Sequence, residues 1–256
     1  MSEYEFFELD VTGGIATITL DRPPLNVLHT PMMVRLNEAL QDLSADDGIV
    51  AVVFRGSGKA FCAGVDVGDH TADKVGAMIE LFHGIFRKLA STDALTIAAV
   101  NGAALGGGCE LACFCDIVLA SDRARFGQPE VQVGVFPPVA ACTLPLQVGL
   151  RHAIELTALG QTIDAAEAHR IGLVSHVYTT DEFDQRVEAC LDHIRTLSRP
   201  VVRMAKKATT LVAREQILAH LEKAERLYLD ELMTLSDAHE GVAAFIEKRA
   251  PAWSHA

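Results

Sequence analysis

Short apolar segments rich in β-branched residues alternate with longer segments of helical periodicity along most of the chain. The apolar segments at 49–54, 96–100, 117–120 and 173–178 have the length and composition of buried strands. Between them, apolar residues recur at intervals of three and four, as in the helix expected from Lys74 onward. Parallel strands require such crossover helices, so the alternation predicts an α/β fold built from parallel βαβ units.

The remaining elements follow from local signals. A hairpin is expected at 6–11 and 15–20, and Thr30 followed by Pro31 predicts a helix start with Thr30 as N-cap. The polar, glycine-containing segment 55–73 is expected to be a functional loop. We divide the chain into a core at 1–198 and a C-terminal helical region at 199–256. Further helices are expected at 151–159, 164–171, 182–197, 201–212, 214–235 and 238–249.

Composition narrows the class of protein. Lys and Arg number 22 against 34 Asp and Glu, so the formal net charge is −12 and neither nucleic acid nor an anionic membrane surface is an expected partner. The uncharged stretch 131–150 contains three prolines, which argues against a membrane span. The six cysteines form no CxxC pair, so we expect buried small side chains, no metal site and a reducing, cytoplasmic setting.

A run of three glycines, Gly106 to Gly108, follows the predicted strand at 96–100 and precedes a short apolar helix. Its loop does not match the dinucleotide-binding fingerprint, and the other glycine-rich loop, from Gly56 to Ala60, does not match a P-loop. Unobstructed backbone N–H groups at a helix N-terminus favour a negatively charged oxygen. A tight strand-to-helix turn explains the same pattern, and without further observations it is the preferred interpretation.

Two glutamates border apolar sequence. Glu110 lies in the apolar helix that follows the glycines, and Glu130 precedes the uncharged stretch. Desolvation raises the pKa of such a carboxyl group, and two of them close together can act as an acid and base pair. For Glu110, an exposed position in the first helical turn fits the pattern equally well.

Several segments together resemble the crotonase, or enoyl-CoA hydratase/isomerase, superfamily. They occur in the family's order and span nearly the whole chain, and they include the glycine run and both glutamates. The matching segments are 59–66, 98–112, 115–121, 126–130, 159–174 and 245–251. The resemblance implies an α/β spiral of ββα units with a C-terminal helical trimerisation region. It also implies an acyl-CoA thioester substrate, no cofactor beyond the coenzyme A of that substrate, and assembly as a homotrimer or a dimer of trimers.

The resemblance assigns roles to individual residues. The oxyanion hole maps onto the backbone N–H groups of Val65 and Gly107, and the catalytic acid pair maps onto Glu110 and Glu130. Glu110 is assigned mainly to the attacking water and Glu130 mainly to the Cα proton. Coenzyme A contacts map onto Lys59, Ala60, Phe61, Ala63, Asp66, Phe245 and Lys248, of which Phe245 and Lys248 are expected to reach a neighbouring subunit's ligand. The acyl pocket is expected to include His70, Met78, Phe82, Phe136 and Pro138.

The resemblance breaks down at Pro138. Hydratases of the family usually have a glycine there, whose N–H lies near the catalytic water, and proline has no N–H. We therefore expect hydration of an enoyl-CoA or a cyclic dienoyl-CoA, with the water held differently. The alternatives are a double-bond isomerase of the same fold and a non-catalytic assembly or RNA-binding member.

Overall fold

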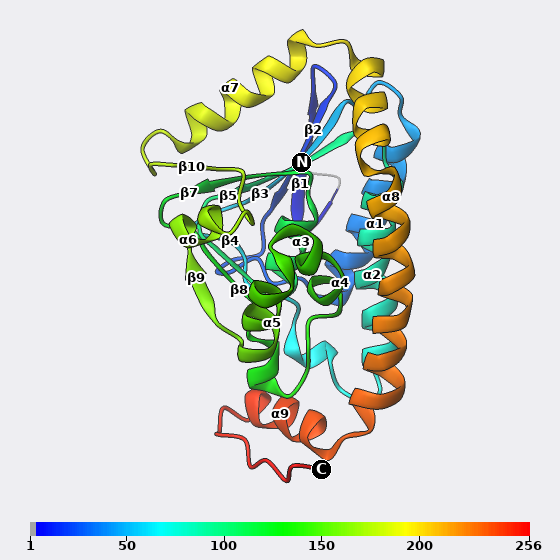
Figure 1. Cartoon of the computed structure of the whole chain (residues 1–256), viewed down its shortest axis with the longest axis vertical. Coiled ribbons are helices and arrows are strands. Elements are labelled where there is room, and N and C mark those ends of the chain that lie inside the picture. Colours follow the sequence, from blue (N-terminus) through cyan, green and yellow to red (C-terminus); the bar gives the residue numbers. More distant parts are fainter. Residues whose placement is uncertain (1–3) are drawn as a thin grey trace.

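The computed structural model describes residues 4–256 and is built around a six-stranded sheet (Figure 1). Its first two strands form the expected antiparallel hairpin, and the remaining neighbours pair in parallel. The prediction of a mixed α/β fold with parallel strands is confirmed. Across the sheet the order is β1 (Phe7–Thr12), β2 (Ile15–Leu20), β3 (Ala51–Gly56), β5 (Leu95–Val100), β7 (Ile117–Ser121) and β10 (His176–Tyr178).

A second sheet consists of four three-residue strands that sequence reasoning missed. Three residues are too few to show an alternating pattern. Its first strand and the 3₁₀ turn η1 (Val67–Asp69) both lie inside segment 55–73, which was expected to be a loop. The order is β4 (Ala60–Cys62), β6 (Ala103–Leu105), β8 (Arg125–Gly127) and β9 (Thr162–Asp164), with β9 antiparallel to β8.

Alternation along the central strands divides the apolar residues between two cores. On β3, Phe54 faces the main core while Val53 faces the opposite side, because successive side chains point to opposite faces of a strand. Helix α7 (Phe183–Thr196) covers that opposite side through Val187 and Leu191, which are buried there. The main core lies on the side that carries most of the helices (Figure 1).

The remaining helices surround the main core. The long helix α8 runs along one flank beside α2 and α4, and α9 packs on η1 and on the 3₁₀ turn η2 (Pro129–Val133) (Figure 1). Within residues 4–256, no helix combines the length and apolarity needed to cross a membrane. The bounds are α1 (Thr30–Ala45), α2 (Val75–Ser91), α3 (Gly107–Phe114), α4 (Pro138–Gln147), α5 (Gly149–Leu159), α6 (Ala165–Arg170), α8 (Arg199–Arg226) and α9 (Ser236–Ile246).

Two local predictions are wrong. The helices expected at 201–212 and 214–235 are one helix, α8, because no glycine or proline interrupts the pattern between them. It ends in a π-helical turn, η3 (Leu227–Glu231), and a short 3₁₀ turn, η4 (Leu232–Thr234). Thr30 is the first helical residue of α1 and not its N-cap. Its N–H and hydroxyl both donate to Asp69 Oδ2 at 2.9 Å, so a distant carboxylate satisfies this helix end.

The cysteines are free thiols, as expected. Cys62, Cys109, Cys113, Cys115 and Cys142 are buried and Cys190 is half-buried. Burial is the largest cause that raises the pKa of Cys62 to about 12, so this thiol stays protonated and behaves as a small apolar group.

Candidate active site

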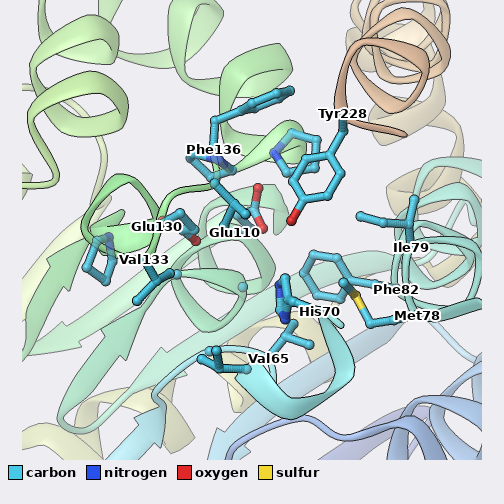
Figure 2. Close-up of a pocket in the computed structure, with 18 of the residues that line it drawn as sticks. Val65, His70, Met78, Ile79, Phe82, Glu110, Glu130, Val133, Phe136 and Tyr228 are labelled. Carbon is cyan, nitrogen blue, oxygen red and sulfur yellow. The ribbon is translucent and has the colours of Figure 1, made fainter. Parts of the chain in front are cut away.

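A cavity of about 310 Å³ lies where α2, α3, η2 and the start of α4 meet the C-terminal region (Figure 2). Apolar and aromatic side chains form most of its wall, and both glutamates face into it. The five residues expected in the acyl pocket all line this cavity. They are His70, Met78, Phe82, Phe136 and Pro138.

Gly106 and Gly107 of the glycine run lie against side chains that leave no room for a Cβ atom. A Cβ atom on Gly106, which has a φ of +51°, would lie 2.8 Å from Glu130 Oε1. A Cβ on Gly107 would lie 2.7 Å from Val65 Cγ2 and 2.9 Å from Phe82 Cζ. Any larger residue at Gly107 would therefore displace Val65 or Phe82, which both line the cavity, so the run does more than make a tight turn.

Two backbone N–H groups are available beside this loop. Leu28 bridges to the segment around Val65 through the carbonyl of Gly64 and the N–H of Asp66, so the N–H of Val65 points to the opposite side. Gly107 is the first residue of α3, and its N–H has no partner within the helix. A Cβ placed on Gly64 would lie 3.8 Å from Gly107 N, which shows that the two segments are adjacent.

Glu110 lies on α3 and is only 2% exposed. Its Oε1 accepts a hydrogen bond of 2.8 Å from the N–H of Ala140 in α4. Burial raises the pKa of Glu110 to about 7, and the N–H groups of Ala140 and Val139 oppose that rise. At neutral pH this carboxyl group can therefore take up or release a proton.

Glu130 lies on η2 and is half-buried. Burial and then the nearby charge of Glu110 raise the pKa of Glu130 well above its ordinary value. With its amide nitrogen turned toward the loop, buried Gln128 donates to Glu130 Oε1 at 3.2 Å and to the Gly106 carbonyl at 3.3 Å. The pKa values of both carboxyl groups are therefore raised, and ionisation of Glu110 disfavours ionisation of Glu130.

The residues expected to bind coenzyme A fall into different environments. Lys59 is exposed on the turn before β4, and Ala63 lines the cavity. Ala60 and Phe61 are buried in the core, and their carbonyls accept from the amide of Asn26. No side-chain contact with a ligand is open to these two residues.

The carboxylate of Asp66 makes contacts within the protein. Its Oδ1 accepts from the N–H of Gly68 at 3.0 Å, and its Oδ2 lies 3.5 Å from Arg22. Asp66 therefore shapes the loop that carries Val65.

Of the two C-terminal residues expected to bind coenzyme A, Phe245 lines the cavity and Lys248 does not. Phe245 is 56% exposed and lines the cavity of its own chain, although a neighbour's ligand was expected to be its contact. Lys248 is exposed and does not line the cavity. The rim therefore includes one aromatic ring from α9.

Tyr228 is a site residue that sequence reasoning missed. It lies on η3 and is 1% exposed, and its ring packs edge to face against Phe136 with centroids 5.2 Å apart. Figure 2 shows its hydroxyl directed into the cavity, beside the carboxylate of Glu110. The surrounding sequence reads as continuous helix, so no pattern marked this tyrosine.

Comparisons with known proteins agree with this fold. The family description enoyl-CoA hydratase/isomerase matches residues 10–256. A probable enoyl-CoA hydratase of Mycobacterium leprae is 39% identical over 256 residues, which is 99% of each chain. The cyclohexa-1,5-dienecarbonyl-CoA hydratase of Thauera aromatica is 35% identical over 247 residues, covering 96% of this chain and 95% of that protein. The crystal structure of an enoyl-CoA hydratase from Mycobacterium avium subsp. paratuberculosis superposes with a TM-score of 0.87 at 26% identity, covering 98% and 99% of the two chains.

The two sheets, the helical C-terminal region and these structural neighbours define a protein of the crotonase superfamily. Within it, the chain belongs to the enoyl-CoA hydratase/isomerase family. Membership implies an acyl-CoA substrate, and the names of the relatives support an enzyme of the hydratase type.

Proposed function

We propose that the protein adds water to the α,β double bond of an enoyl-CoA thioester and catalyses the reverse elimination. The observation that carries this proposal is the pair of glutamates in one apolar cavity, beside two backbone N–H groups that have room for a thioester oxygen. A double-bond hydratase needs one group to activate water, another to protonate Cα, and donors for the enolate oxygen. Glu110, Glu130 and the N–H groups of Val65 and Gly107 are the candidates for these roles.

The N–H groups of Val65 and Gly107 would bind the thioester oxygen and stabilise the negative charge that develops on it. A thioester held there has Cα and Cβ within the cavity that both glutamates face (Figure 2). The apolar wall excludes bulk water and strengthens these hydrogen bonds. Catalysis at this site then requires no metal ion, since the charge is stabilised by fixed dipoles.

We assign the two glutamates different roles in this reaction. Ionised Glu110 takes a proton from water as the oxygen bonds to Cβ, and the π electrons move to the thioester oxygen. The enolate then collapses as protonated Glu130 delivers its proton to Cα. One proton returns from Glu110 to Glu130 before the next turnover, so the enzyme is restored.

The acyl group is proposed to be short or cyclic. Phe82, Phe136, Tyr228 and Phe245 give the cavity aromatic walls that suit a flat ring. The Thauera aromatica relative is named for a cyclic dienoyl thioester, and this supports the same proposal. Crotonyl-CoA and cyclohexa-1,5-dienecarbonyl-CoA are therefore the two substrates to compare.

The test is loss of the conjugated enoyl-thioester absorbance on mixing with each substrate. We expect turnover by the natural protein and a loss of about 100- to 10,000-fold in kcat for Glu110→Gln and for Glu130→Gln. Glu8→Gln, which changes an exposed glutamate on β1, is the matched control and should be fully active. Absence of turnover with any enoyl-CoA, or full activity of Glu110→Gln, would refute the proposal.

One observation favours a second candidate, a double-bond isomerase. Pro137 and Pro138 leave the start of α4 without two N–H groups that could hold a water. An isomerase needs no water, only proton transfer at Cα and Cγ. Double-bond movement without uptake of oxygen from ¹⁸O-labelled water would select this candidate.

A further inference from the structure

The cavity contains a buried hydroxyl group without a partner. Among residues 4–256, five side chains have a buried polar atom that makes no hydrogen bond: His29, Thr71, His83, Asn101 and Tyr228. Of these, only Tyr228 lines the cavity that holds the glutamates. A buried hydroxyl without a partner costs about 1–3 kcal/mol, so its retention at this position calls for a ligand atom.

The local backbone fixes where this hydroxyl lies. Tyr228 occupies the π-helical turn η3, an arrangement that occurs often at functional sites. Ring packing against Phe136 orients the side chain into the cavity. Burial and then the charges of Glu130 and Glu110 raise the pKa of Tyr228, so the hydroxyl remains protonated and can donate.

Several other groups that line the cavity near Glu110 have no free proton to donate. Pro137 and Pro138 have no N–H, and the N–H of Ala140 is bound to Glu110 itself. His70 Nδ1 lies 3.1 Å from the carbonyl of Asp66, which can only accept, so this proton is also committed. The amide of Gln132 donates to the carbonyl of Gly160 at 3.2 Å.

We propose that the hydroxyl of Tyr228 holds the attacking water beside Glu110, which makes Tyr228 a catalytic residue. This inference rests on the proposed hydration. The water accepts a hydrogen bond from Tyr228 and donates one to the free carboxylate oxygen of Glu110. Its second lone pair then faces Cβ.

The reaction step balances with tyrosine unchanged. The water loses one proton to Glu110 and forms the new C–O bond, while Tyr228 keeps its own proton throughout. In the product the new β-hydroxyl group accepts the hydrogen bond that the water accepted. Tyr228 thus occupies the role left vacant by Pro138.

The test is Tyr228→Phe, with Tyr178→Phe on β10, outside the cavity, as the matched control. We expect Tyr228→Phe to lower kcat for hydration by about 10- to 100-fold with little change in KM. Exchange of the Cα proton of butyryl-CoA with D₂O needs the oxyanion donors and a glutamate but no attacking water. This exchange should continue at the natural rate in Tyr228→Phe.

Each outcome decides the question. Equal loss of hydration and of Cα exchange would mean that Tyr228 only maintains the site, and would overturn the inference. Hydration by Tyr228→Phe at the natural rate would overturn it while leaving the proposed function intact. Absence of hydration by the natural protein would refute the proposed function, and this inference with it.

Discussion

Burial of Glu110 should destabilise the folded protein at alkaline pH, and Glu110→Gln should remove that cost. The fold raises the pKa of this carboxyl group from 4.5 to about 7. Each pKa unit corresponds to 1.36 kcal/mol, so ionisation in the folded state costs about 3 kcal/mol. Below pH 4.5 the carboxyl group is protonated in the folded and the unfolded state, so its burial carries no ionisation cost. The free energy of unfolding then decreases as the pH rises from 4.5 through 7.

The assay is urea unfolding of the natural protein and of Glu110→Gln at pH 5 and pH 8. Between pH 5 and pH 8, ionisation of Glu110 lowers the free energy of unfolding of the natural protein by about 2.5 kcal/mol. We therefore expect the free energy of unfolding of Glu110→Gln, measured relative to that of the natural protein, to be about 2.5 kcal/mol higher at pH 8 than at pH 5. This corresponds to a difference of about 5–10 °C in Tm.

The carbonyl of the new glutamine can still accept from Ala140, so the substitution changes charge with little change of shape. Glu8→Gln, at an exposed position, should show the same difference from the natural protein at both pH values. If Glu110→Gln also differs from the natural protein by the same amount at both, the reasoning from desolvation is refuted.

Three further outcomes follow from the geometry. The value of kcat/KM should fall as the pH is lowered, with a midpoint near the pKa of Glu110, about 7, because the ionised form of Glu110 activates water. A kcat/KM that stays constant from pH 5 to 8 would contradict this role. Gly107→Ala should lower kcat/KM by about 100-fold or more, because the added methyl group meets Val65 and Phe82. Gly76→Ala in α2 is the control and should be fully active, because a Cβ there has open space. Equal activities of the two variants would contradict the close approach at Gly107. Lys206→Met should destabilise the protein by about 1–3 kcal/mol in urea unfolding, because the carbonyl of Ala94 loses its hydrogen bond from the ammonium group and Asp116 loses the ion pair now 2.7 Å long. Lys207→Met, at an exposed position, is its control and should change stability by less than about 1 kcal/mol.

The predictions that depended on repeated patterns agree best with the structure. The strands at 96–100 and 117–120 have enough consecutive apolar residues to show burial on both faces, and the structure has strands there. The four three-residue strands show no such pattern. Their pairing depends on contacts between segments far apart in the chain, such as Ala103 with Arg125.

The residues of the candidate site also differ in how far the sequence could predict them. Glu110 and Glu130 could be singled out because a carboxyl group is unusual next to apolar sequence, and both face the cavity. Their separation in space could not be derived, since it depends on how η2 packs against the glycine run. Tyr228 follows Glu110 by more than a hundred positions, and a tyrosine on a helix is ordinary in composition. Only the folded chain shows that its hydroxyl has no partner.

The cavity is completed by residues that are synthesised well after the two glutamates. Both glutamates belong to the first part of the chain, but Tyr228 and Phe245, which close one side, come from its end. On a ribosome, a nascent chain that stops short of Tyr228 leaves Glu110 and Glu130 open to water, with pKa values closer to those of free carboxylic acids. The dry acid pair therefore forms only after Tyr228 has been synthesised, and a chain cut before Tyr228 lacks it.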